Sequence, residues 1–421
     1  MTASAQLDGG PAAAQERAFP ALDGMRILAA VAVVVSHTAS KSGASVVPGY
    51  DAALLAHLDV GVAVFFVLSG FLLFRPFPLA AVQQRPAPDA RAYLWRRALR
   101  ILPAYWVVVV AAMLLIPENS GTGAGTLLRY LTLTHIYDDA GFTTAYGLDQ
   151  TWSLSTEVAF YAVLPLLAAG LVWSSRGTAG RPWPALLVLL GLTVAGSLFL
   201  YGVMQRPWEL YPTNIWLPSL VGWFAGGMAL ALLTVADPDW APVRAARALG
   251  GHLGLCWLGA AALYALTATP ISGPHDYFTP TSPSETVIRN LLHMGVAVLL
   301  VLPLVLGHER GGRVRRALSG RTAHRLGEIS YGVFLVHMPL LYGLYSWFDL
   351  PALSGGLLPV TVLVLAPSIS IAAGLYLVVE RPLRRFRSLV PGTARAPAPG
   401  HHPALATTPV VPRPANGGVT P

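Results

Sequence analysis

The stretch LDGMRILAAVAVVVSH at residues 22–37 decides the fold. It belongs to an apolar run over about 21–47, which is long enough to cross the hydrocarbon core of a bilayer as a helix. Arg26 and His37 interrupt it, and ionisable side chains inside a membrane helix are costly, so they mark candidate functional positions. Eleven helical residues return to within about 20° of the starting direction and rise about 16 Å, so we expect both side chains on one face. The alternative is an arginine that reaches lipid headgroups and a core histidine bonded to a neighbouring helix.

The composition around this stretch points to the same class of protein. Of the 421 residues, 54% are apolar and 11% are charged, whereas soluble domains carry about 25% charged residues. The mean hydropathy is +0.56. The single cysteine, Cys256, rules out an intrachain disulfide, and the composition excludes a soluble enzyme and a disordered protein. The net charge of +8 comes from arginines in short loops without interleaved aromatic residues, so we expect no nucleic-acid partner.

The apolar runs predict an all-α integral membrane protein with about ten transmembrane helices. We place them at about 21–47, 58–75, 101–117, 152–174, 185–204, 214–235, 252–269, 287–306, 326–347 and 357–379. Arginines concentrate in alternate connections, above all 75–100, 307–325 and 381–387. By the positive-inside rule, both termini are cytoplasmic and the long 118–151 segment lies outside. That segment, which holds His135, Asp138, Asp139 and Asp149, either covers an acceptor site or is a solvated loop.

The two ends differ from the apolar body of the chain. Residues 1–18 are small and polar without the apolar core of a signal peptide, and residues 388–421 are rich in Pro and Ala. We expect both to be disordered around a membrane domain at 19–387. No histidines or cysteines have the spacing of a local metal motif, and His401 and His402 are isolated, so we expect no metal.

Two further motifs carry candidate residues near one end of the helices. In VFFVLSGFLLFRP, Ser69 and Gly70 are typical of close packing between membrane helices, and Arg75 follows. In YLWRRALRILPAYW, Arg97 and Arg100 share a helical face. Arginine forks suit phosphate oxygens, but most arginines here also satisfy the positive-inside rule without any ligand.

Two motifs place polar groups deeper in the membrane. DQTWSLSTEVAFY puts Glu157 below the outer surface, where a buried acid needs a partner, and by depth His37 is the expected one. GEISYGVFLVHMPLL puts His337 at a similar depth, with Tyr331 nearer the cytoplasm. Near the end of the last run, Glu380 lies beside Arg381 and is expected to form a structural ion pair.

Taken in order, these motifs resemble the membrane acyltransferase-3 family over about residues 19–387. The resemblance implies an integral-membrane enzyme that crosses the membrane several times, in the bacterial plasma membrane. Such an enzyme uses cytoplasmic acyl-CoA, usually acetyl-CoA, to acylate hydroxyls of carbohydrates or glycosylated small molecules. The essential arginine and histidine of the family correspond to Arg26 and His37, and its R-x-x-R motif to Arg97 and Arg100.

One position departs from the family pattern, which commonly has two adjacent acids where this chain has Glu157 followed by Val158. Glu157 therefore either acts alone or has a structural role.

The resemblance and the residue pattern together predict a mechanism. The CoA phosphates would bind Arg26, Arg97 and Arg100, with Arg75 nearby, and His37 would act as general base or carry the acyl group. Glu157 would orient the imidazole or hold the acceptor, and Ser69, Tyr331 and His337 are candidate substrate-binding residues. The competing interpretation is a transporter or exporter of acylated or glycosylated small molecules. A non-catalytic scaffold would leave the Arg26–His37 stripe unexplained.

Overall fold

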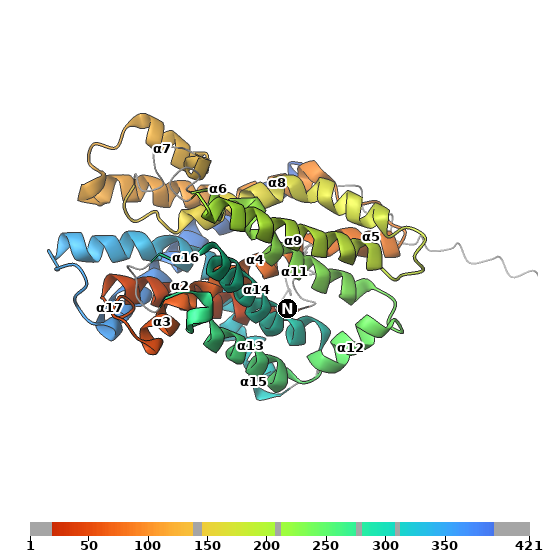
Figure 1. Cartoon of the computed structure of the whole chain (residues 1–421). Helices are drawn as coiled ribbons and strands as arrows, with labels where there is room; N and C mark the ends of the chain where they lie inside the picture. The colour runs from red at the N-terminus through yellow and green to blue at the C-terminus, as the bar shows by residue number, and fades with distance from the viewer. Residues whose placement is uncertain (1–18, 138–144, 207–211, 275–279, 308–311, 391–421) are drawn as a thin grey trace, which may run out of the picture.

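The computed structural model describes residues 19–137, 145–206, 212–274, 280–307 and 312–390, and these parts form a bundle of long helices (Figure 1). The long helices are α2 (Ala21–Lys41), α4 (Val60–Phe74), α6 (Ala90–Leu115), α8 (Thr151–Ser174), α9 (Trp183–Met204), α11 (Leu217–Val235), α13 (Leu253–Thr267), α14 (Pro283–Leu306), α16 (Arg321–Trp347) and α17 (Leu357–Leu375). Shorter elements are α3 (Tyr50–Ala56), the 3₁₀ turn η1 (His57–Asp59), α5 (Pro76–Val82), α7 (Ala124–Leu131), α12 (Ala241–Gly250), α15 (Arg313–Leu318) and α18 (Arg381–Leu383). No strand occurs in the described residues. The predicted all-α membrane class is confirmed.

The number of membrane crossings follows from the helices and from where the chain ends lie. Within the described ranges, nine segments are long and apolar enough to span, and α12 with α13 forms a tenth if that pair, bent by 88°, counts as one. Phe19, before α2, lies under the Arg75 guanidinium, and Trp95 near the start of α6 donates to the carbonyl of Phe386 near the other end. Both ends of the described chain therefore lie at one end of the bundle. An even number of crossings is needed, so we count α13 as the tenth.

The same contacts separate arginine-rich from arginine-poor connections. Gly24 of α2 packs against Leu318 of α15, which brings the 307–325 connection to the end that holds Arg75. At the opposite end, Lys41 lies over the Tyr342 ring, and Trp347 donates to the carbonyl of Leu115. The alternation in the sequence thus sorts the described connections onto two ends, and assigning the arginine-rich end to the cytoplasm remains a prediction of the positive-inside rule.

Helix boundaries differ from the prediction where polar residues begin a helix. α6 starts at Ala90, not near 101, because the Asp89 side chain caps it by accepting the Ala92 N–H at 2.7 Å. Arginine is a good helix former, but a search for runs of apolar residues does not detect these charged first turns. α14 starts at Pro283, where Ser282 and Glu285 form a capping box.

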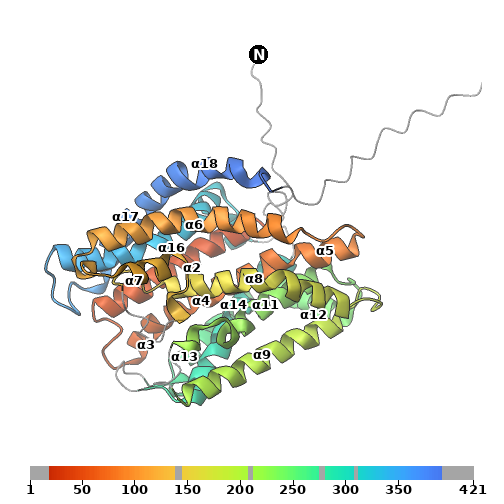
Figure 2. The same ribbon diagram turned by 90° about the horizontal axis from the view of Figure 1, so that it is seen from above.

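The inner helices of the bundle are those that carry the polar candidates. Figure 2 shows α2, α4 and α16 in the middle of the bundle. The most apolar window is 67% buried in α16 and 61% buried in α2, against 22% in α9 and 17% in the last span. The outer helices present their apolar side chains to lipid, whereas the inner ones can enclose a polar site.

Small residues let the inner helices approach closely. A Cβ added at Gly70 of α4 would overlap the backbone carbonyl oxygen of Phe224 in α11, and one at Gly227 of α11 would overlap that of Val67. The packing role predicted for Gly70 is confirmed. The close contact holds α4 at a fixed depth beside α11.

The predicted domain limits are only partly within reach of the structure. Residues 1–18 and 391–421 lie outside the described residues, so their expected disorder stays a prediction. The last described helical turn ends at Ser388, one residue beyond the predicted boundary of the membrane domain.

Candidate active site

A pair of histidines joins the two most buried polar helices. His37 of α2 and His337 of α16 are linked by a 2.9 Å contact between Nδ1 and Nε2, and their rings stack with centroids 5.2 Å apart. His337 is completely buried. The expected pairing of His37 with Glu157 is wrong. Depth in the membrane, on which that expectation rested, does not tell which helix faces which.

The hydrogen bonds around this pair fix where its protons lie. Nδ1 of His337 is 2.6 Å from the carbonyl oxygen of Phe334, which can only accept, so Nδ1 carries the proton. In a neutral ring Nε2 of His337 is then an acceptor, and it receives the Nδ1–H of His37. The Nε2 lone pair of His37 is left to accept a proton from another molecule.

A proline supports this arrangement from the next turn of α16. Pro339 has no N–H, so the carbonyl of Leu335, four residues earlier, loses its helical partner. The Gln150 side chain replaces it by donating Nε2–H to Leu335 at 2.8 Å. Gln150, in the DQTWS stretch, thereby holds the turn that carries His337. The sequence analysis missed this residue, although a polar residue facing an intramembrane proline is a usable signal.

Glu157 belongs to a second polar cluster. Ser69 of α4 donates a hydrogen bond to it across the two helices, and Tyr161 also bonds to it. Arg97 and Tyr93 of α6 lie within electrostatic reach of this group. The Tyr93 hydroxyl is buried and has no hydrogen-bond partner among the described residues, so a ligand here would satisfy it.

The arginines occupy different positions around the arginine-rich end. Arg26 pairs with Asp23 at 2.9 Å, and the second oxygen of Asp23 contacts His324 at 2.8 Å. Arg75 donates from Nε to Thr234 of α11 at 3.0 Å. The structure keeps these two arginines at the predicted end, each already ordered by a partner within the protein.

The second arginine of the R-x-x-R motif points to another group. Arg100 lies within electrostatic reach of Glu380 and of Tyr331, whose hydroxyl donates to the carbonyl of Ile101 at 3.0 Å. The expected ion pair of Glu380 with Arg381 is not found in the described chain. Side chains of adjacent helical residues do not face each other, and the charged neighbours of Glu380 include Arg100 instead.

The described parts of the 118–151 connection, residues 118–137 and 145–151, contain buried polar side chains. His135 is buried, stacks on Tyr130 with centroids 4.2 Å apart, and contacts Thr151 at 3.1 Å. Burial lowers the pKa of His135 to about 4 and raises the pKa of Asp149, so both groups favour their uncharged forms. Asp138 and Asp139 lie outside the described residues.

A third polar group was missed by the sequence analysis. His57 and Asp59 of η1 and His293 of α14 offer ligand atoms that all lie within 4.8 Å of one another. Asp59 is also within electrostatic reach of His37. Because 234 residues separate Asp59 from His293, no local spacing could have predicted this cluster.

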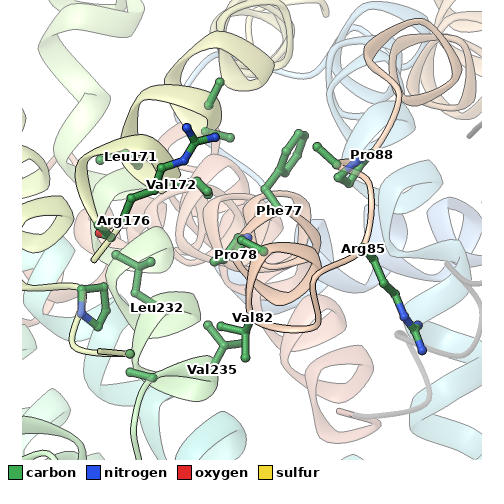
Figure 3. A pocket seen from close by; sticks show the side chains of 18 of the residues that line it. Phe77, Pro78, Val82, Arg85, Pro88, Leu171, Val172, Arg176, Leu232 and Val235 are labelled. Carbon is green, nitrogen blue, oxygen red and sulfur yellow. The ribbon is translucent and has the colours of Figure 1, made fainter. Parts of the chain in front are cut away.

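A cavity of about 700 Å³ lies away from the histidine pair. It lies between α5, α8 and α11 at the arginine-rich end, and none of the predicted site residues lines it. Its walls are mainly apolar, with Arg176 beside Leu171 and Val172 on one side and Arg85 on the other (Figure 3). Phe77 of this cavity packs edge-on against Tyr93, next to the Glu157 cluster.

Comparison with known proteins decides the family. The profile described as an acyltransferase domain matches residues 19–377. The chain belongs to the acyltransferase-3 family. It is a multi-pass membrane O-acyltransferase, and this sets aside a transporter as its primary class.

Relatives of this acyltransferase carry related names. The chain is 30% identical to the exopolysaccharide production protein ExoZ of Rhizobium meliloti over 345 residues, covering 77% of this chain and 89% of that protein. It is 23% identical to the peptidoglycan O-acetyltransferase OatA of Listeria monocytogenes over 197 residues, covering 43% of this chain and 28% of that protein. It is 22% identical to nodulation protein 10 of Rhizobium leguminosarum over 326 residues, covering 68% of this chain and 72% of that protein. No solved structure matches the chain.

Proposed function

We propose that this acyltransferase moves an acyl group, acetyl in the simplest case, from cytoplasmic acyl-CoA to a hydroxyl of a carbohydrate or glycosylated acceptor outside the cell membrane. The observation that carries the proposal is the ordered pair His37–His337, which leaves one imidazole nitrogen unprotonated in the interior of the bundle. The names of the polysaccharide and peptidoglycan relatives support a carbohydrate acceptor.

The donor enters from the arginine-rich end in this proposal. Arg26, with Arg75 nearby, binds the CoA phosphates, because guanidinium forks match phosphate oxygens. Arg97 and Arg100 continue this cationic path on α6. The phosphates at Arg26 and the thioester at His37 are then about 16 Å apart along α2, a distance that the pantetheine arm can span.

The chemical step uses the Nε2 lone pair of His37. Nε2 removes the proton of the acceptor hydroxyl while the oxygen attacks the thioester carbonyl carbon. The tetrahedral intermediate collapses, the carbon–sulfur bond breaks, and the CoA sulfur takes the proton back from Nε2. His337 accepts from Nδ1–H throughout and stabilises the imidazolium that forms.

The same nitrogen could instead attack the thioester and carry the acyl group. Rapid denaturation at neutral pH during turnover, where an acyl-imidazole hydrolyses slowly, separates the two routes: an acylated His37 requires the carrier route, and its absence supports the general-base route.

Glu157 has a positioning role in this proposal. It bonds to Ser69 and Tyr161, whereas His37 bonds to His337. In this proposal Glu157 therefore orders the donor path near Arg97. In this proposal Tyr331 and Ser69 border the donor path, since the first bonds to Ile101 of α6 and the second to Glu157 of α8.

The test is transfer of labelled acetyl from acetyl-CoA by the purified protein in lipid nanodiscs, with acceptor glycans presented as candidates. Hydrolysis of the thioester in the absence of acceptor serves as a readout that does not depend on the acceptor. His37→Ala should lower both rates by on the order of 10²–10⁴-fold while acetyl-CoA still binds. The matched control is His252→Ala, which removes an exposed histidine. Unchanged rates in His37→Ala would refute the assigned base.

A further inference from the structure

The polar group formed by His57, Asp59 and His293 lies beside the site and has no part in the proposed chemistry. His57 and Asp59 come from η1, which is tied to α2 because Ser36 donates to the carbonyl of Ala56 at 2.9 Å. His293 reaches the group from α14. Two separate elements therefore hold three potential ligands in one place.

The buried imidazole of His293 has a ring nitrogen that could bind a metal ion. Its side chain is 4% exposed, and its Nε2 has no hydrogen-bond partner among the described residues. The atom facing it is Oδ1 of Asp59, at 3.9 Å, too far for a direct hydrogen bond. Burial thus fixes the position of the His293 ring. A buried polar atom without a hydrogen-bond partner needs an explanation.

The separation between these atoms suits an ion placed between them. Two ligands at 2.0–2.1 Å in a tetrahedral site lie about 3.3 Å apart. Asp59 can make the remaining shift, because its side chain is 54% exposed. The His57 ring, 5.9 Å from that of His293 and nearly perpendicular to it, supplies the third ligand.

The chemistry of the ligands selects the kind of ion. Two imidazole nitrogens and one carboxylate oxygen suit zinc and similar transition metals, not calcium or magnesium. Arg289, one turn before His293, also lies within electrostatic reach of Asp59. That positive charge repels every divalent ion to the same extent, so the selection between ions rests on the ligand atoms.

We propose that His57, Asp59 and His293 form a binding site for one divalent transition-metal ion of the zinc type, directly beside His37. Three protein ligands leave a fourth position for water or another oxygen. The site does not depend on the proposed acyl transfer, because metal binding is measured without donor or acceptor.

The test is metal binding by the whole protein in nanodiscs. The protein is purified without a histidine tag, in a background of His401→Ala and His402→Ala, and stripped with a chelator. Zn²⁺ alone is titrated against a competing chromophoric chelator, and bound zinc is counted by mass spectrometry. Co²⁺ replaces Zn²⁺ as a spectroscopic probe of tetrahedral coordination.

We expect one bound equivalent of zinc and intense visible bands with cobalt. Loss of a ligand should weaken binding more than the 10–100-fold that loss of an outer-shell partner costs, so Asp59→Asn and His57→Gln should lower zinc affinity by more than about 100-fold. Both substitutions are close in size, and Asp59 is half exposed, so thermal unfolding should show that both variants fold. His252→Ala should bind zinc like the parent. No bound equivalent in the parent, or equal affinity in Asp59→Asn, would overturn the proposal.

Discussion

Replacing His337 by alanine tests the hydrogen-bond chain more sharply than replacing His37 itself. The substitution removes the acceptor for the Nδ1–H of His37 and leaves the arginines of the donor path in place. The base is still present but is no longer held in the required protonation form or orientation. We therefore expect a loss of turnover number with little change in the KM for acyl-CoA.

The size of the loss follows from the bond that is removed. In the transition state His37 becomes an imidazolium, so the lost bond is one to a charged group, worth about 1.5–3 kcal/mol. At 1.36 kcal/mol per factor of ten, kcat should fall by about 10- to 150-fold. That range reaches only the lower end of the 10²–10⁴-fold expected for loss of the base in His37→Ala.

The assay is acetyl transfer or thioester hydrolysis in nanodiscs, with protein amounts matched between variants. His337→Gln should recover part of kcat, because its amide oxygen can accept from Nδ1–H of His37. Ser330→Ala on the same helix is the control for a general disturbance of α16, since among the described residues Ser330 bonds to Gly327 of its own helix. The double variant of His37 and His337 should be no slower than His37→Ala, because both residues act as one unit.

Two results would refute this reasoning. One is a His337→Ala protein with the parent kcat, which would mean that His337 does not hold the base. The other is a multiplied loss in the double variant, which would mean that the two histidines act independently.

The remaining predictions concern the donor, the packing and the orientation. Arg26→Ala should raise the KM for acyl-CoA with folding retained, and Arg26→Lys should restore it only in part, since lysine lacks the fork; an unchanged KM would leave Arg26 a lipid contact. Gly70→Ala should lower the free energy of unfolding by about 1–3 kcal/mol, and with it the thermal unfolding temperature, because α11 leaves no room for a methyl group. Gly170→Ala, with nothing within 4 Å, should raise or keep it, and equal effects would contradict the packing argument. In a Cys256→Ala background, Val314→Cys should react with a thiol label only after the cytoplasmic side is exposed; labelling of intact cells would reverse the orientation.

The sequence predicted the helices well wherever the apolar pattern was continuous. The predicted run at 152–174 and the helix Thr151–Ser174 agree to one residue, because twenty apolar residues in a membrane have no other stable form. The prediction was less accurate at polar helix starts, such as Ala90 in α6, where capping and not hydropathy sets the boundary. It also placed Arg26 and His37 on a single helix, α2, since helical periodicity is a local property.

Local periodicity could not say which residues meet across helices. It gave the depth of His37, Glu157 and His337 but not the rotation of the helices about their axes. The structure pairs His37 with His337 and leaves Glu157 to Ser69. Each choice depends on how α2, α4, α8 and α16 pack, which is fixed by contacts among residues far apart in the chain.

The sequence by itself therefore determined the membrane class, the helical spans and the family, because these depend on apolar length and on motifs read along the chain. Only the tertiary structure decided the partner of the base, the proton positions in the histidine pair and the cluster of His57, Asp59 and His293. A hydrogen bond or a metal site needs atoms within about 2–3 Å of their partner. A sequence pattern fixes such distances only within one helix, and between helices they follow from packing.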